Sequence, residues 1–278
     1  MKYCNMAIVA LGFLLCFASS LFADSCDIID NTRLSSAEIL NILHELNWIP
    51  DGKNNSRVVY IIAAPWCPVS KALYDKTRLL TGDIQFRWVM VGANDNNSSL
   101  INRSLSFTRD QKKLNSLFTT GSVPQINDNT AVEADKINIL GFDVIKLSLD
   151  KLYGKTTGYP TLVFYNGSGI SVFSGIPSNL NTVLEKAKHF PAENDNYIDS
   201  LNGAKSIPLH HETFIVKKPE VVVHIRPSIN SFNLAVLKQN LKIIPNAMIQ
   251  LKNNSRWIYI QVFSNGLGGW SQLEGFSN

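Results

Sequence analysis

Residues 57–71 read RVVYIIAAPWCPVSK and hold the strongest structural signal in the chain. The apolar, β-branched run from Val58 to Ala64 predicts a central strand that is buried on both faces. Pro68 then opens a helix that continues to about residue 80, because proline fits a first helical turn, where its missing N–H is not needed. Cys67 therefore lies where the strand meets the helix, and the unpaired N–H groups of that turn favour its thiolate form.

A second pattern begins at residues 158–161, which read GYPT. It opens an apolar strand over 161–165. The turn-forming residues 166–169 follow, and they lead into another apolar strand over 170–173. The spacing predicts an antiparallel pair of strands that starts at Pro160.

The two patterns together resemble the thioredoxin fold, in which WCPVSK-like residues (here 66–71) follow a buried strand and a proline opens a later one. The resemblance implies that Pro160 is cis and packs against the Cys67 sulfur. It also implies that the backbone of Tyr159 binds an extended substrate peptide as an added strand. On the same analogy, the site has catalytic positions at Cys67, Ser70 and Pro160, and substrate-binding positions at Trp66, Pro68 and Tyr159.

The segment between the two patterns is long. A strand over 84–92 is followed by about 65 residues before Pro160, and residues 107–118 and 131–153 have helical spacing. A helical insertion at this place resembles the periplasmic disulfide isomerases and related Dsb-type proteins. We expect an α/β thioredoxin-like fold with a helical insertion in a domain over residues 24–190.

Ser70 occupies the position at which a dithiol oxidoreductase of this family carries its second cysteine. The site is therefore monothiol. Cys67 can attack a substrate disulfide and form a mixed disulfide, but Ser70 cannot attack back to release it. Isomerisation remains possible, because a thiol freed from the substrate can resolve the mixed disulfide.

Two main functions remain open. One is thiol-disulfide exchange on exported proteins through Cys67, as a monothiol isomerase, reductase or covalent holdase. The other is a redox-inactive thioredoxin-fold binding or assembly factor of the cell envelope, which is favoured by Ile61 and Ile62 in a strand where many thioredoxin-like proteins carry an acid. Lys71 either stabilises the thiolate or is an ordinary solvated helix residue. A cysteine peptidase is disfavoured, because no downstream histidine stands in a recognisable motif.

The first 23 residues have the features of a cleaved signal peptide. Lys2 precedes an apolar run over 7–18, and small residues up to Ala23 suit signal-peptidase cleavage. A retained interfacial anchor is the alternative. Cleavage removes Cys4 and Cys16, and we expect an exported, periplasmic protein.

Cys26 would then lie near the new N-terminus. Three interpretations are open: an unpaired or intermolecular thiol, a resolving thiol for Cys67, and a lipid attachment site. Asp24 fits poorly in the small-residue site that a lipoprotein signal requires.

Residues 191–215 are polar and rich in turn-forming types, and they predict a linker. The pair His210-His211 lies near its end. Neighbouring residues of a strand point to opposite faces, and no carboxylate or cysteine cluster accompanies the pair. We interpret it as a solvated pair and expect no metal site.

Residues 216–278 predict short strands separated by turns, and hence a small, all-β barrel. The residues IRPS (225–228), Trp257 and Gly269-Trp270 resemble those of the bacterial SH3-like domain. This resemblance implies binding of cell-wall peptide or of an envelope protein through exposed aromatic side chains. Trp257 and Trp270 fit either such contacts or the core.

The overall composition is that of a globular protein. The 278 residues are 45% hydrophobic and 17% charged, and the net charge of +4 is too small to indicate nucleic-acid binding. The length allows one large domain or two smaller ones. The chain shows no glycine-rich phosphate loop, paired catalytic carboxylates or cysteine-rich metal site, so we expect no cofactor.

Overall fold

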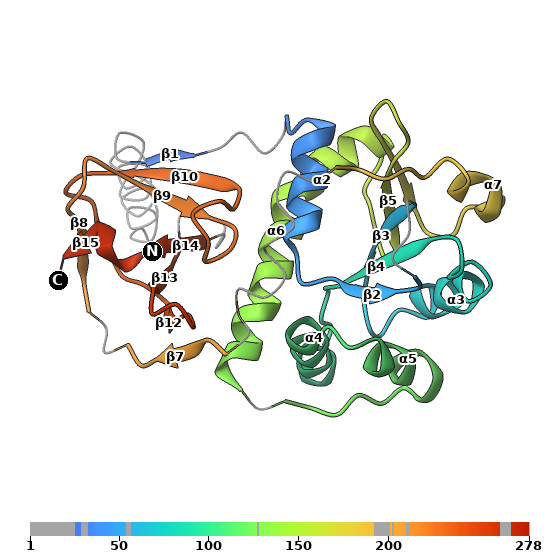
Figure 1. Cartoon of the computed structure of the whole chain (residues 1–278), viewed down its shortest axis with the longest axis horizontal. Helices are drawn as coiled ribbons and strands as arrows, with labels where there is room; N and C mark the ends of the chain where they lie inside the picture. Colours follow the sequence, from blue (N-terminus) through green and yellow to red (C-terminus); the bar gives the residue numbers. More distant parts are fainter. Residues whose placement is uncertain are drawn as a thin grey trace, which may run out of the picture.

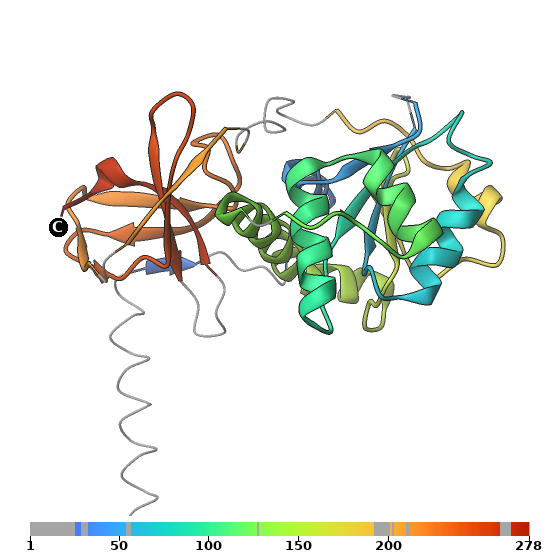
Figure 2. The same ribbon diagram turned by 90° about the horizontal axis from the view of Figure 1, so that it is seen from below.

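The computed structural model describes residues 26–28, 33–53, 57–126, 128–191, 201, 203–209, 212–261 and 268–277. Within them the chain forms an α/β unit and a β unit, and the long helix α6 (Asn129–Tyr153) lies between the two (Figures 1 and 2). The proposed signal peptide (1–23) and His210-His211 lie outside the described residues. Among the described helices, none has the length and apolar character needed to cross a membrane.

A five-stranded sheet forms the centre of the α/β unit. Its order is β2-β4-β3-β5-β6, and only β3 and β4 run parallel. The strands are β2 (Ile49–Asp51), β3 (Val58–Ala63), β4 (Gln85–Met90), β5 (Thr161–Tyr165) and β6 (Ile170–Ser174). Every residue of β3 is buried, as its uninterrupted apolar sequence predicts.

Helices cover both faces of this sheet. The apolar residues of α2 (Ser36–Glu45) and α6 pack with Val58, Tyr60 and Ile62 of β3. On the other face, Val59 and Ile61 pack with α3 (Pro68–Thr77), α4 (Asn96–Thr108), α5 (Gln111–Thr120) and α7 (Leu180–Leu184). The expected α/β class with a helical insertion before β5 is confirmed.

The insertion differs from its prediction in one respect. Residues 107–118 were expected to form one helical stretch, but α4 ends at Thr108 and α5 begins at Gln111. Arg109 adopts a left-handed conformation with φ of 52°. The Asp110 side chain accepts a hydrogen bond from the Lys112 N–H and caps the new helix. The cap and the left-handed residue together turn the chain between the two helices.

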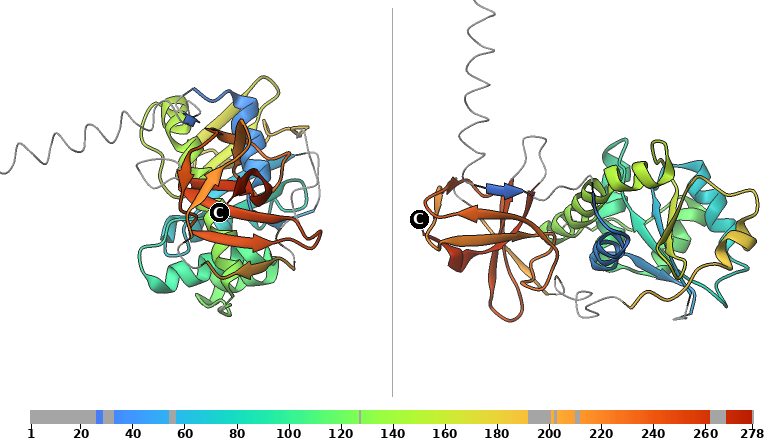
Figure 3. Two further views of the ribbon diagram at one scale, coloured as in Figure 1. Left: turned by 90° about the vertical axis from the view of Figure 1, so that its left-hand side faces the viewer. Right: turned by 90° about the horizontal axis from the view of Figure 1, so that it is seen from above.

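The β unit contains two sheets (Figure 3). The larger has the order β1-β10-β9-β14-β13-β12-β7, and the smaller has the order β11-β8-β15. Their bounds are β1 (Cys26–Ile28), β7 (Lys205–Ile207), β8 (Phe214–Val216), β9 (Glu220–His224), β10 (Asn233–Lys238), β11 (Lys242–Ile243), β12 (Ala247–Gln250), β13 (Arg256–Gln261), β14 (Gly268–Gln272) and β15 (Phe276–Ser277).

The expected closed barrel is wrong, because within the described chain the seven-stranded sheet ends at β1 on one side and β7 on the other. Both end strands are three residues long, and β7 lies inside the expected linker. β1 pairs with β10, so the chain enters the β unit before it builds the α/β unit. The likeness to an SH3-like domain stays a prediction.

Two tryptophans of the β unit belong to its core. Trp257 is 2% exposed and Trp270 is fully buried. The Trp257 ring packs edge-on against His224, and the Trp270 ring packs edge-on against Tyr259. Neither indole is available as a ligand contact. Of the two roles that the sequence allowed, core packing and ligand binding, both tryptophans therefore have the first.

Candidate functional site

Cys67 is the N-cap residue of α3, directly after β3. Its backbone is extended (φ −82°, ψ 117°), and Pro68 occupies the first helical turn. The thiol is free and only 7% exposed. The Sγ atom lies 3.3 Å from the carbonyl oxygen of Tyr159, to which the thiol donates a hydrogen bond. The two sequence patterns, 92 positions apart, therefore meet at the sulfur.

The Tyr159–Pro160 peptide bond is cis. Two hydrogen bonds hold this turn: the Gly158 N–H donates to Ser174 Oγ (2.9 Å), and Thr161 Oγ1 donates to the Gly158 carbonyl (2.6 Å). Within the described part of the chain, the Tyr159 N–H has no hydrogen-bond partner. A backbone donor next to the thiol is thus available to a ligand.

The aromatic ring of Tyr159 has two aromatic neighbours. Trp66 meets it edge-on with a centroid distance of 6.3 Å, and Phe142 of α6 lies 5.9 Å away. Burial, followed by the charge of Asp143, raises the pKa of Tyr159, so the phenol is neutral at physiological pH. The Trp66 side chain is 46% exposed and forms an apolar surface beside the sulfur.

Gly92 fits between these aromatic groups. It has a φ of +74°, and a Cβ atom built there would lie 2.6 Å from the Tyr159 ring. Its carbonyl accepts a hydrogen bond from Trp66 Nε1 at 2.8 Å. Sequence reasoning did not identify Gly92 or Phe142 as site residues, although Gly92 ends the predicted strand, a place where glycine allows the backbone to turn.

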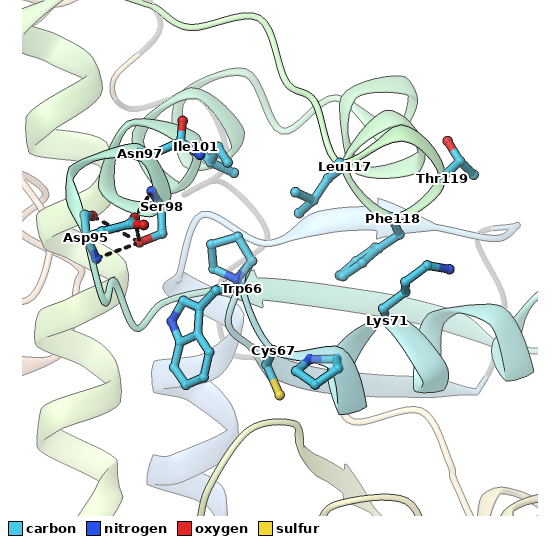
Figure 4. Close-up of a pocket in the computed structure, with 13 residues that line it drawn as sticks. Trp66, Cys67, Lys71, Asp95, Asn97, Ser98, Ile101, Leu117, Phe118 and Thr119 are labelled. Carbon is cyan, nitrogen blue, oxygen red and sulfur yellow. Dashed lines mark hydrogen bonds between the residues drawn. The ribbon is translucent and has the colours of Figure 1, made fainter.

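A cavity of about 340 Å³ adjoins Cys67 (Figure 4). Trp66, Cys67 and Pro68 line it on one side, and Ile101 of α4 and Phe118 of α5 line it on another. The inserted helices thus form part of the surroundings of the thiol. Lys71 also borders the cavity, but its Nζ atom is paired with Asp75 at 2.8 Å.

Ser70 lies in the first turn of α3 and is fully buried. Its Oγ atom has no hydrogen-bond partner among the described residues. Ile61 and Ile62 of β3 are also fully buried, so this strand places no acid behind the thiol. The environment of Ser70 is therefore apolar, and it offers no base that would activate the hydroxyl.

Cys26 lies in β1, where its backbone pairs with Leu237 of β10. Figures 1 and 3 show β1 in the β unit, on the far side of α6 from α3. For direct exchange with Cys67, β1 would have to leave β10. The described residues contain no group of three or more histidine, cysteine or acidic side chains that could hold a metal ion.

No family model matches the sequence, and no curated protein matches it. Several solved structures are similar over part of the chain, among them the following three. A disulfide interchange protein from Neisseria gonorrhoeae is 23% identical over 52% of this chain and 97% of its own, with a TM-score of 0.38. The thiol-disulfide exchange protein alpha-DsbA2 from Wolbachia pipientis is 18% identical over 54% and 93%, with a TM-score of 0.33. Proteus mirabilis ScsC in a compact conformation is 14% identical over 65% and 90%, with a TM-score of 0.37.

Proposed function

We propose that the chain is an exported thiol-disulfide exchange protein that acts on other exported proteins through Cys67. One observation carries the proposal: a free thiol at the N-terminus of a helix lies 3.3 Å from the carbonyl of Tyr159, whose own N–H is unpartnered within the described chain. The Tyr159 backbone can hold an extended peptide beside this thiol. Trp66, which is half-exposed, flanks that peptide.

The proposed reaction is a reversible exchange of sulfur partners. The Cys67 thiolate attacks one sulfur of a substrate disulfide, so that a bond forms between Cys67 Sγ and that sulfur while the substrate S–S bond breaks. The second substrate sulfur leaves as a thiolate. A different substrate thiolate then attacks the mixed disulfide, which forms a new substrate disulfide and returns Cys67 as a thiolate. No net oxidation or reduction takes place.

Ser70 makes isomerisation the favoured mode. A hydroxyl cannot break a mixed disulfide, so the complex lasts until a thiol from the substrate or from a small-molecule reductant resolves it. The same property suits a covalent holdase. Pro160 and Pro68 shape the site, and Cys26 takes no part in the exchange within one chain, because it lies in β1.

The alternative is a redox-inactive binding or assembly factor of the envelope. It is favoured by the low exposure of Cys67 (7%) and by the absence of an acid from β3. In either case we propose that the β unit binds a second partner, either cell-wall peptide or an envelope protein. The resemblance to SH3-like domains motivates this part of the proposal.

One experiment separates exchange from binding. Scrambled ribonuclease is incubated with the protein carrying Cys26→Ser, and samples are quenched with acid. Mixed disulfides are quantified on non-reducing gels, and ribonuclease activity is measured in parallel. We expect a covalent complex and recovery of activity, both of which Cys67→Ser abolishes. A binding factor would instead form no covalent complex and would retain its affinity for the scrambled protein after Cys67→Ser.

The pH dependence of Cys67 alkylation in the Cys26→Ser protein provides a second readout. An activated thiolate reacts with iodoacetamide at pH 7 at a rate close to its maximum. If Cys67 reacted only at pH values above those at which a free thiol ionises, or only after unfolding, the result would contradict the enzymatic proposal.

A further inference from the structure

The long helix α6 has an exposed side that no other described element covers fully. Lys136, Ile139, Asp143 and Leu147 follow at intervals of three and four residues, so they lie along one side of the helix. We refer to these four residues as the α6 face. Ile139 is 42% exposed and Leu147 is 51% exposed. Two large apolar side chains thus flank one acid on an open surface.

Helix α6 contacts both the thiol site and the β unit. On one side, Phe142 of α6 contacts the Tyr159 ring at 5.9 Å, and the Tyr159 carbonyl lies 3.3 Å from Cys67 Sγ. On the other side, Lys136 Nζ lies 5.1 Å from the centre of the Tyr259 ring in β13. A peptide that extends from Cys67 past the Tyr159 ring toward Phe142 would therefore meet α6.

Asp143 is the acid without a salt-bridge partner on this face. Lys136 is paired with Glu133 (2.9 Å), and Lys146 is paired with Asp150 (2.7 Å). Asp143 has no ion pair or hydrogen bond within the described part of the chain, although Lys146 is near enough to act on its charge. Partial burial raises the pKa of Asp143. A cationic ligand next to this carboxylate would lower its pKa again.

Two tyrosines on either side respond to the charge of Asp143. It contributes to the raised pKa of Tyr159, after burial. It also contributes to the raised pKa of Tyr259, which is about 12, after burial and the charge of Glu133. Asp143 follows Phe142, whose ring contacts Tyr159, and it lies on the same side of α6 as Lys136, whose Nζ lies over the Tyr259 ring.

We propose that the α6 face binds the segment next to the reacting cysteine of an extended substrate, and that Asp143 selects a lysine or arginine side chain there. This inference rests on the proposed function. The cation would pair with the Asp143 carboxylate, which has no ion pair within the described part of the chain. Ile139 and Leu147 would contact apolar side chains on either side. An extended chain advances about 3.3 Å per residue, so three to five residues span roughly 10 to 17 Å, and the test covers this range on either side of the cysteine.

The test uses peptides that differ only in charge. Each contains one cysteine as a mixed disulfide with thionitrobenzoate, with either lysine or glutamate three, four or five residues before or after it. Attack by Cys67 in the Cys26→Ser protein joins Cys67 to the peptide and releases thionitrobenzoate, whose absorbance gives the rate. We expect the lysine peptide to react about threefold faster at the best position, which is the size of effect typical of an exposed ion pair. Salt at about 0.5 M should reduce this ratio.

Two variants isolate Asp143. Asp143→Asn should bring the lysine-to-glutamate ratio close to one, and Asp143→Lys should invert it. Asp83→Asn removes an exposed carboxylate in the turn between α3 and β4 and should leave the ratio unchanged. Equal rates for both peptides at every position would overturn the subsite and leave the exchange function standing. A failure of Cys67 to react with any of the peptides would overturn the proposed function itself.

Discussion

At the scale of single residues, Ser70 determines what Cys67 can do. It lies three positions after Cys67, is fully buried and has an Oγ atom without a partner among the described residues. Ser70→Cys puts a thiol of similar size where the hydroxyl was. The new thiol should attack the Cys67 mixed disulfide, release the substrate in reduced form and leave a disulfide within the protein. We expect the lifetime of the mixed disulfide on a quenched non-reducing gel to fall at least about tenfold.

Ser70→Ala is the matched control for that change. It has no second thiol, so the lifetime of the mixed disulfide should equal that of the parent protein. A buried hydroxyl without a partner costs stability, so this variant should unfold at an equal or higher urea concentration, with a gain of up to about 1 kcal/mol. If Ser70→Ala shortens the lifetime as much as Ser70→Cys does, the resolving role of this position is wrong.

The sequence predicts part of the site because short motifs carry local geometry. The WCPVSK residues after a predicted strand and the proline before a later one resemble the thioredoxin fold, and this resemblance implied that Pro160 packs against the Cys67 sulfur and that the Tyr159 backbone binds substrate. The positions of Gly92 and Phe142 could not be predicted in the same way. Each contacts the Tyr159 ring from another element, and neither lies in a local pattern that signals this contact.

At the scale of secondary-structure elements, α6 carries an acid on its buried side. Asp135 is 5% exposed, and burial raises its pKa to about 7, against the opposing charge of Arg103. The folded protein therefore holds a proton that the unfolded chain, with an ordinary aspartate pKa near 3.8, has lost. The contribution of this group to stability is complete below about pH 4 and falls as the pH rises toward 7.

Asp135→Asn should remove this dependence on pH. The amide stays neutral, so the variant should not lose stability as the pH rises. Between pH 4 and pH 7, the free energy of unfolding of the variant should therefore rise relative to that of the parent protein. The expected shift is on the order of 2 to 4 kcal/mol. Urea unfolding at both pH values measures it, with Asp83→Asn as the exposed control. A shift no larger than that of the control would show that Asp135 ionises normally in the folded protein.

Most elements follow from apolar periodicity and strand propensity. The strands near 58–63, 85–90, 161–165 and 256–261 lie where their hydrophobic runs predicted them. The three-residue strands β1 and β7 do not, because they are too short for an alternating pattern to be recognised. Their position is determined by the strands next to them, β10 and β12.

At the scale of the whole molecule, the two units share one apolar core. Residues of α2 and α6, such as Leu43 and Ile145, belong to the same buried cluster as Val223 and Trp270 of the β unit. This association could not be predicted from the sequence. The buried polar contacts between α2 and the β unit link residues more than 180 positions apart, and no local sequence pattern signals them.

Glu45, the last residue of α2, makes the polar contacts of this junction. Its buried carboxylate accepts hydrogen bonds from Ser231 Oγ (2.5 Å) and from the Phe232 N–H (3.0 Å). Its backbone carbonyl accepts one from the buried guanidinium of Arg226. Glu45→Ala leaves the two donors unmet and removes a negative charge close to Arg226. We expect a loss of about 2 to 4 kcal/mol in the free energy of unfolding.

The same variant also tests whether the β unit belongs to the substrate site. Weakening the junction should let Tyr259 move away from Asp143, so the preference for lysine peptides should fall while Cys67 still reacts with both kinds of peptide. Glu274→Ala, which removes an exposed carboxylate of the β unit, is the control and should change neither stability nor preference. If Glu45→Ala lowers the free energy of unfolding but leaves the preference for lysine peptides unchanged, the subsite is confined to α6 and Tyr159. A change in neither would mean that Glu45 does not hold the units together.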